Sequence, residues 1–471
     1  MNSYKKLVNN SIIFSIGNLG SKIVSFILVP LYTYYLSATE FGTVDLVVTT
    51  STMLVPVVSL SMQDAVMRFV MDDRQKKDFV ISSAFFIGFV GLIASLLLLP
   101  VLNLIPSFNK YIGAIYLLLL VEIFEIISSQ YARGIGETKL FAFNGFLLTL
   151  NTGLLNLLFI VLLDLGINGY LLATTLSYLI SFIFLLIKLE LYKKVKLASV
   201  KKFVVKDLVQ YSLPMIPNSI MWALINASSR YFILFYLGIS YNGLFAVASR
   251  IPAIINIISS VFSQAWQLSA IEEYENASKS KFYNNIFDVL CSVMFLSTFF
   301  IITLLKPMFN ILFDVQYYEA WKVVPFMLIG IVFSAFSSFF GGIYIASKKT
   351  QGVLKTSVYG GISSLILNIL LIPRLGLIGT GISSLISFFI MFFSRAIDTR
   401  KLVSLNINWK KILANVTILL ILTIILLLNL KIYLEVVFIL LLLIFIILVN
   451  KVIFINFKII LFNFLKKNKE Y

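Results

Sequence analysis

The sequence contains no histidine and a single cysteine, Cys291. Zinc and haem sites take many of their ligands from these two residue types, and a redox pair of thiols needs two cysteines. The composition therefore argues against a metal site, a haem or a disulfide scaffold. Cys291 lies within an apolar run, which favours a small packing residue over a reactive thiol.

Charged residues are also scarce, at 13% of the 471 residues, whereas 60% are apolar. Soluble proteins carry about 25% charged residues, and fourteen membrane helices would need about 280 apolar positions. These proportions exclude a soluble globule and a disordered chain. The net charge of +17 is interpreted as loop charge that sets membrane topology rather than as a nucleic-acid surface.

The chain has no nucleotide-binding P-loop motif and no long hydrophilic segment. It lacks what an ATP-driven pump would need, and we expect no enzyme and no catalytic residue. A membrane-embedded glycan polymerase or ligase would use a sizeable outer loop with catalytic arginine or histidine residues. Here the outer loops are short and histidine is absent. The remaining functions are those of a polytopic membrane protein with little mass outside the bilayer.

Apolar windows bounded by polar residues, glycine or proline predict an all-α polytopic membrane protein of about fourteen transmembrane helices, with twelve or thirteen as the alternative. Short joins near residues 164–167 and 372–376 predict tight helical hairpins. The windows are 11–35, 43–66, 80–105, 111–131, 141–164, 167–188, 211–237, 243–269, 282–305, 322–346, 352–372, 376–396, 411–430 and 432–455.

The distribution of basic residues predicts the orientation. With the N-terminus in the cytoplasm, roughly 30 of the 38 Lys and Arg residues fall on the cytoplasmic side of these windows. Such an asymmetry predicts an even number of spans with both termini cytoplasmic. Residues 395–411 are counted among these cytoplasmic segments.

An internal repeat joins the two halves of the sequence. Residues 36–42 resemble 237–243, and residues 166–169 resemble 376–379. The separation spans an even number of helices, so both copies have the same orientation, as in parallel transporter repeats. We predict two six-helix lobes around a central cavity. The predicted domains are a lobe at 1–190, a basic cytoplasmic linker at 191–210, a lobe at 211–400, and two additional helices with a basic tail at 401–471.

Several short segments carry a family resemblance, namely residues 17–22, 30–37, 229–233, 243–251 and 262–266. In order and spacing they resemble the bacterial polysaccharide-transport (Wzx-like oligosaccharide flippase) family. That family belongs to the multidrug/oligosaccharidyl-lipid/polysaccharide exporter superfamily. One departure is Ser229, where an acidic residue is more usual before the arginine.

The resemblance implies a flippase for undecaprenyl-diphosphate-linked oligosaccharide units of O-antigen, capsule or exopolysaccharide. It implies a multi-pass protein of the bacterial cytoplasmic membrane, with a lipid-linked substrate and with glycosyltransferases and a polymerase as partners. Two alternatives within the superfamily are a lipid II flippase and a cation-coupled multidrug exporter. No cofactor is expected other than a proton or sodium gradient.

Three basic residues fall inside predicted spans: Lys22, Arg230 and Arg250. A charge at bilayer depth costs at least about 2.5 kcal/mol, so each should face a partner or a wet cavity. We predict that these three cations bind the diphosphate or acidic sugars of the substrate. The alternative for the two arginines is that their side chains extend to the outer headgroups.

Two acidic residues, Glu122 and Glu125, lie three positions apart in one predicted span and therefore share a helix face. They are candidates for proton or sodium coupling, and the alternative is an ion pair with a cation such as Lys22. Asp45 is predicted at the start of the second span, in a cap or dipole role. Pro30 and Pro252 are candidate hinges, because proline interrupts helical hydrogen bonding.

Overall fold

The computed structural model describes residues 24–71, 76–103, 108–213, 215–272, 274, 279–347 and 351–451. In these ranges the chain forms helices and their connections, without strands. Twelve of the described helices are long and apolar enough to cross a membrane. The predicted all-α polytopic membrane fold is thereby confirmed. The remaining two predicted windows coincide with the shorter apolar helix Val24–Tyr35 and with α11, Met215–Tyr236.

By its internal contacts the chain divides into two compact units, Met1–Ala246 and Val247–Tyr471. This division rests on packing, whereas the lobes predicted above rest on the repeat. The elements of the first unit are α2 (Ala38–Val58), α3 (Met62–Val70), α4 (Lys77–Ser95), η1 (Leu96–Leu98), α5 (Leu99–Asn103), α6 (Ile112–Gly134), α7 (Thr138–Asn156), η3 (Leu157–Leu162), α8 (Gly166–Lys188), α9 (Leu191–Lys194), η4 (Leu197–Ser199), α10 (Lys202–Ser212), α11 and α12 (Ile239–Ala248).

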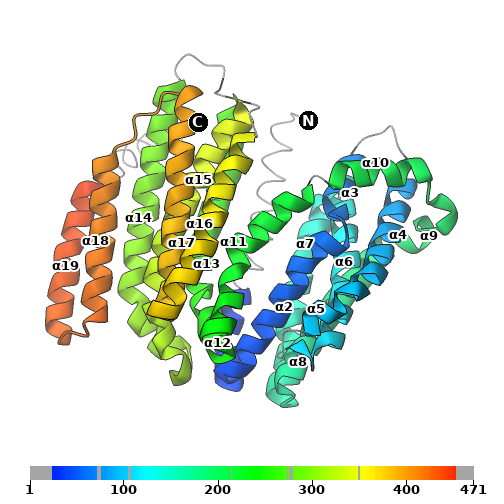
Figure 1. The fold of residues 1–471 in the computed structure, drawn as a ribbon, viewed down its shortest axis with the longest axis horizontal. Coiled ribbons are helices and arrows are strands. Elements are labelled where there is room, and N and C mark those ends of the chain that lie inside the picture. The colour runs from blue at the N-terminus through cyan, green and yellow to red at the C-terminus, as the bar shows by residue number, and fades with distance from the viewer. Residues whose placement is uncertain are drawn as a thin grey trace, which may run out of the picture. The chain divides into compact units, whose positions relative to one another are not determined.

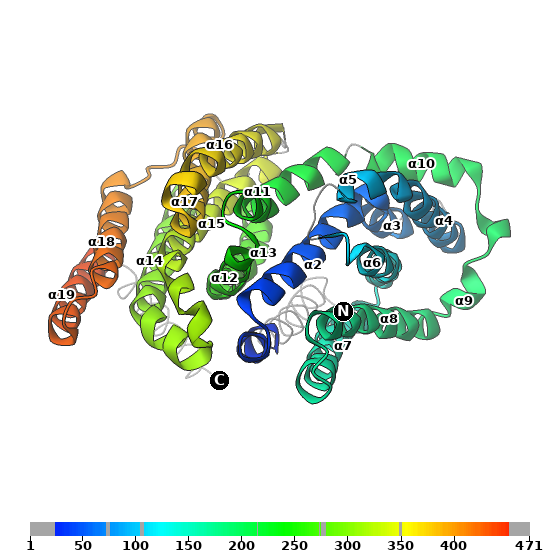
Figure 2. The same cartoon turned by 60° about the horizontal axis from the view of Figure 1, so that its bottom comes forward.

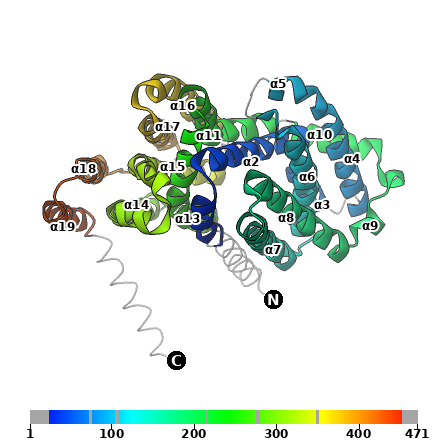
Figure 3. The same cartoon turned by 90° about the horizontal axis from the view of Figure 1, so that it is seen from below.

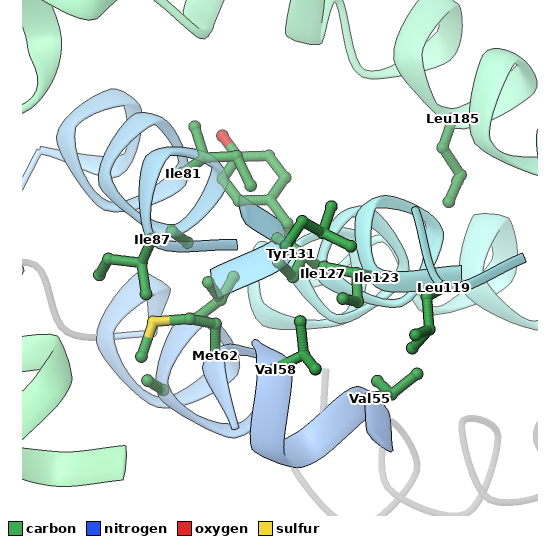
Figure 4. Close-up of a cluster of buried hydrophobic side chains, with 14 of the residues drawn as sticks. Val55, Val58, Met62, Ile81, Ile87, Leu119, Ile123, Ile127, Tyr131 and Leu185 are labelled. Atoms are coloured by element: carbon green, nitrogen blue, oxygen red, sulfur yellow. The ribbon is translucent and has the colours of Figure 1, made fainter. Parts of the chain in front are cut away.

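The core of the first unit lies between α2, α3, α4 and α6 (Figure 4). Val55 and Val58 of α2 pack with Ile123 and Ile127 of α6, and Met62 of α3 joins the same cluster. Both faces of each of these helices are apolar, but only the face that meets neighbouring helices is buried in the protein. The opposite faces expose large apolar residues, as expected for helices surrounded by lipid.

The second unit contains α13 (Arg250–Glu272), α14 (Lys279–Leu312), η5 (Val315–Lys322), α15 (Val324–Ala346), α16 (Gln351–Leu375), α17 (Leu377–Asp398), η6 (Thr399–Lys401), α18 (Trp409–Leu427) and α19 (Ile432–Val449) (Figure 1). Helix α15 is its central element, packed against α13, α14 and α17. Phenylalanine rings fill these contacts: Phe287 packs in edge-on or tilted geometry against Phe336, Phe339 and Phe340. Helices α18 and α19 lie side by side (Figure 2).

Two glycine-based hairpins occupy equivalent places in the predicted repeat. Gly166, the first residue of α8, has φ +51°, and Gly376, the residue before α17, has φ +58°, a left-handed conformation that glycine adopts without strain. Three residues on, a Cβ on Gly169 would lie 2.9 Å from the carbonyl oxygen of Phe159, and one on Gly379 would lie 2.6 Å from that of Leu371. Glycine therefore permits both the reversal and the close helix packing after it, and Figure 3 shows α7 beside α8.

The start of α2 corrects one sequence-based prediction. Ser37 caps this helix and Glu40 completes a capping box, in which the Ser37 backbone N–H donates to Glu40 Oε2 over 2.9 Å. Asp45 therefore lies in the third helical turn and has no capping role. Its burial in a span requires a different partner.

Candidate functional site

The two carboxyls of α6 lie in a polar network that runs across the first unit. Both side chains are buried, and both face away from lipid toward neighbouring helices. Glu122 accepts hydrogen bonds from Ser51 Oγ of α2 at 3.1 Å and from Thr52 Oγ1 at 3.2 Å. The predicted shared helix face is thus present, and it is directed into the helix bundle.

Glu125 contacts a different pair of helices. Its Oε1 accepts a hydrogen bond from Asn144 Nδ2 of α7 at 2.6 Å, and Ser181 Oγ of α8 lies 3.2 Å away. Ser181 Oγ is also 2.8 Å from Asn144 Oδ1, and one hydroxyl proton cannot serve both acceptors at once. The acidic pair therefore connects α2, α6, α7 and α8 through partners that carry no charge.

Two ionised carboxylates with so few neutral donors would be poorly solvated at membrane depth. Among the described residues, neither Glu122 nor Glu125 takes part in an ion pair. A proton or a small cation bound to Glu122 or Glu125 would reduce this cost. The predicted alternative partner, Lys22, lies outside the described residues.

Arg230 of α11 forms an ion pair that the sequence did not reveal. Its Nε donates to Asp45 Oδ2 of α2 at 2.5 Å, and both side chains are largely buried. The guanidinium also lies over the ring of Phe245 of α12, 5.4 Å from its centroid. The absence of an acid at Ser229 is therefore compensated by a carboxylate that is 185 positions away in the sequence.

Around this ion pair α2 makes further contacts with α11 and α12. Tyr231 Oη lies 2.9 Å from Thr50 Oγ1, one turn beyond Asp45 along α2. Gly42 of α2 and Gly243 of α12 meet at backbone distance, so that a Cβ on either would collide with the main chain of the other helix. The two glycines occupy equivalent positions in the predicted repeat. A charged contact and a backbone contact thus join α2 to α11 and α12.

The other predicted residues are placed as follows. Arg250 is the first residue of α13 and belongs to the second unit, whereas Arg230 belongs to the first. Pro252 lies in the first turn of α13, just after the interruption at Ser249 that separates α12 from α13. Proline has no N–H to donate to the Ala248 carbonyl, which explains the break. Pro30 lies within the helix Val24–Tyr35, where Thr33 Oγ1 donates to its carbonyl at 2.8 Å.

Arg395 is a buried cation that the loop count overlooked. It lies inside α17, with only 4% of its surface exposed. Its guanidinium donates to the Ser337 carbonyl of α15 at 2.7 Å, and to Thr356 Oγ1 at 3.0 Å and Ser357 Oγ at 2.9 Å, both on α16. Gly341 leaves room for it, since a Cβ there would lie 3.2 Å from Nη1.

Two further ion pairs attach the terminal helices to α14. Lys411 Nζ of α18 donates to Asp288 Oδ1 at 2.6 Å and to Ser292 Oγ at 2.8 Å. Lys306 Nζ of α14 lies 3.2 Å from both carboxylate oxygens of Glu435 of α19. The sequence does not reveal these pairs because both lysines lie at the ends of predicted spans: Lys306 directly follows the window 282–305, and Lys411 begins the window 411–430.

These observations define the class of protein: a multi-pass, all-helical membrane protein with internally bonded charges in its spans. The polysaccharide biosynthesis protein family matches residues 7–267, more than half of the chain. The chain belongs to this polysaccharide biosynthesis protein family.

Solved structures give the same fold. The lipid II flippase MurJ, in an inward closed conformation, matches with a TM-score of 0.67 at 16% identity, over 96% of this chain and 100% of that one. An outward-facing multidrug resistance MATE family transporter of the MOP superfamily matches with a TM-score of 0.59 at 16% identity, over 85% and 97%. A MOP superfamily transporter from Pyrococcus furiosus matches at 0.60, with 16% identity and the same coverage. No curated protein matches the sequence.

Proposed function

We propose that this protein flips undecaprenyl-diphosphate-linked oligosaccharide units from the inner to the outer leaflet of the bacterial cytoplasmic membrane, by alternating access. The observation that carries the proposal is the match of residues 7–267 to the polysaccharide biosynthesis family, on a chain with a MOP-superfamily transporter fold. In this proposal the protein is not an enzyme, and glycosyltransferases and a polymerase act before and after it.

The basic residues at membrane depth fit such a substrate. A lipid diphosphate is polyanionic, and it needs cations along its path because the surrounding dielectric is low. We assign this role to Lys22, Arg230 and Arg250. Arg230 is bonded to Asp45 through Nε in this structure. A bidentate diphosphate would compete with this single carboxylate, so that substrate entry exchanges one partner of Arg230 for another.

We assign the coupling of transport to a proton or sodium gradient to Glu122 and Glu125. Their bonding to Ser51, Thr52, Asn144 and Ser181 joins helices that would have to move during transport. Protonation or cation binding at this pair changes which of these hydroxyl and amide groups can donate to it. The ion gradient then biases one conformation over another. Pro30 and Pro252 are the proposed bending points.

The test is the sidedness of the lipid-linked oligosaccharide in cells that are depleted of the protein. Intact and lysed spheroplasts are treated with a membrane-impermeant enzyme that cleaves the sugar. Flipping predicts that the lipid-linked unit accumulates and becomes accessible only after lysis. Complementation with Arg230→Gln should fail, whereas Arg374→Gln, at an exposed arginine near the end of α16, should restore export.

Two results would favour the alternatives. Accumulation of inward-facing lipid II, with normal sidedness of other lipid-linked sugars, would assign the lipid II substrate, for which the MurJ fold is a precedent. Unchanged pools of both lipids, together with loss of resistance to cationic compounds, would assign a multidrug exporter. An outward-facing but unpolymerised pool would contradict all flippase assignments.

A further inference from the structure

The segment between α8 and α11 carries an unusual combination of charge and exposed apolar surface. Residues 189–213 contain six lysines, against two acidic residues, Glu190 and Asp207. Glu190 is bonded to Lys193 at 3.1 Å. Most of the lysine charge is therefore uncompensated within the segment.

The segment is fixed against one end of the first unit. Ser82 of α4 donates from Oγ to the Lys194 carbonyl and accepts from the Lys196 N–H, each at 3.2 Å. Lys201 Nζ lies 5.6 Å from the ring centroid of Phe79, at the start of α4. Helix α10 packs across α3 and α4, running transverse to the long helices of the unit (Figure 1). This transverse orientation at the end of the long helices is the one expected of a helix at a membrane surface.

Three large apolar side chains point away from this support. Leu197 is 83% exposed, Phe203 is 57% exposed and Tyr192 is 56% exposed. Val204 and Leu208, on the opposite face of α10, are buried against the unit. The segment from α9 to α10 thus carries more apolar surface than the protein itself covers. Exposure of this apolar surface to water is unfavourable.

Lysines surround these apolar side chains. Lys196 precedes Leu197, and Lys202 and Lys206 lie on either side of Phe203 within one helical turn. Basic residues beside apolar or aromatic ones characterise helices that lie in the headgroup region of an anionic membrane. Lysines near such a surface are attracted to its negatively charged phosphates.

We propose that residues 189–213 form a binding surface for the anionic phospholipids of the leaflet at this end of the unit. The lysines contact lipid phosphates, while Leu197, Phe203 and Tyr192 insert among the upper acyl-chain carbons. The surface sets the depth of the first unit in the bilayer. The proposal depends on residence in the membrane and is independent of which molecule the protein transports.

The test uses the full-length protein in liposomes, with the buried Cys291 replaced by alanine. A bimane fluorophore is attached to Leu197→Cys, and a matched control carries it on Glu137→Cys, an exposed polar position in the connection between α6 and α7. Quenching by lipids brominated along their acyl chains is compared with quenching by iodide in the buffer. Liposomes are made from phosphatidylcholine alone or with added phosphatidylglycerol.

We expect brominated lipids to quench the probe at position 197 and iodide to reach it poorly, with the opposite pattern at position 137. Phosphatidylglycerol should strengthen lipid quenching at 197 alone. Changing Lys196, Lys202 and Lys206 to glutamine should remove that phosphatidylglycerol effect. These three lysines are exposed, so the change leaves the buried contacts of the segment intact.

Equal access of iodide to both positions, in either lipid mixture, would overturn the proposal. Protection of position 197 in native membranes but not in liposomes of purified protein would also overturn it, and would point to an acidic protein partner. A phosphatidylglycerol effect that survives the lysine changes would exclude the proposed role of charge.

Discussion

The two units differ in how they carry charge inside the membrane. Besides the ion pair between Arg230 and Asp45, the first unit buries two acidic side chains, Glu122 and Glu125, whose described partners are neutral hydroxyls and an amide. The second buries Arg395 among carbonyl and hydroxyl oxygens, and secures its outer helices through Lys306 and Lys411.

The comparison distinguishes two kinds of buried charge. Some, such as Arg395, stabilise the fold, and others, such as Glu122 and Glu125, are available to exchange a partner. A guanidinium has five donors in a fixed plane, and at Arg395 these donors join α17 to α15 and α16. Such a cation acts as a structural bond. A carboxyl group with few donors gains by taking up a proton or cation, so the acidic pair is suited to switching. We expect removal of charge to damage folding in the second unit and coupling in the first.

The largest expected effect follows replacement of Arg395 by alanine. The change leaves the Ser337 carbonyl and the hydroxyls of Thr356 and Ser357 without their donor. We expect a loss of about 3 kcal/mol in the free energy of unfolding, since each abandoned buried acceptor costs about 1–3 kcal/mol. Thermal unfolding in detergent measures it. If Arg395→Met unfolds at the wild-type temperature, the guanidinium contributes nothing to stability.

A somewhat smaller effect is expected where the first unit relies on close backbone packing. In Gly243→Ala the added Cβ collides with the Ala38 backbone of α2. Overpacking of this kind costs about 1–3 kcal/mol. Gly145→Ala is the matched control, because a Cβ at Gly145 has no atom within 4 Å. Thermal unfolding of the two variants should separate them, and equal stability would contradict the close crossing of α2 and α12.

An intermediate effect is expected for the ion pair between α14 and α19. A double-mutant cycle of Lys306→Met and Glu435→Leu should give a coupling energy of about 1–2 kcal/mol, with each single variant less stable than the double variant. The single variants leave an unpaired charge in a poorly solvated position. Additive losses across the cycle would show that the pair does not hold α19 in place.

The smallest effect on stability, with the sharpest effect on transport, is expected for Glu125→Gln. Glutamine keeps the shape and can still accept from Asn144, so the free energy of unfolding should change by less than about 1 kcal/mol. Flipping in vesicles should become independent of an imposed ion gradient. Retained gradient dependence in both Glu125→Gln and Glu122→Gln would remove the acidic pair from the coupling mechanism.

Much of the fold was accessible from the sequence because a membrane imposes simple rules. Span length follows from bilayer thickness, and the hairpins at Gly166 and Gly376 follow from glycine's access to positive φ. The candidate site could be predicted only in part from the sequence. Both acidic residues were identified from their spacing, but their partners on α2, α7 and α8 come from distant parts of the sequence.

Two failures have a common physical origin. Asp45 was placed at a helix start and Arg395 in a cytoplasmic segment, because hydropathy windows lose accuracy where polar residues approach a span end. In the fold, α2 begins at Ala38 and α17 continues to Asp398, so both residues become internal. A charged residue near the end of a span can be recognised as buried only when the helix that packs against it is known.

The crossing of α2 and α12 has a mechanical consequence. Side chains are absent where Gly42 and Gly243 meet, so rotation there requires no change of rotamer between the two helices. We expect the contact to act as a pivot between α2 and α12. Val58, at the far end of α2, lies about 24 Å along the helix from Gly42, at about 1.5 Å per residue. A rotation of roughly 10° at the pivot therefore displaces that end by about 4 Å. This leverage turns a small angular change at one end of a helix into a displacement comparable to the width of a side chain at the other.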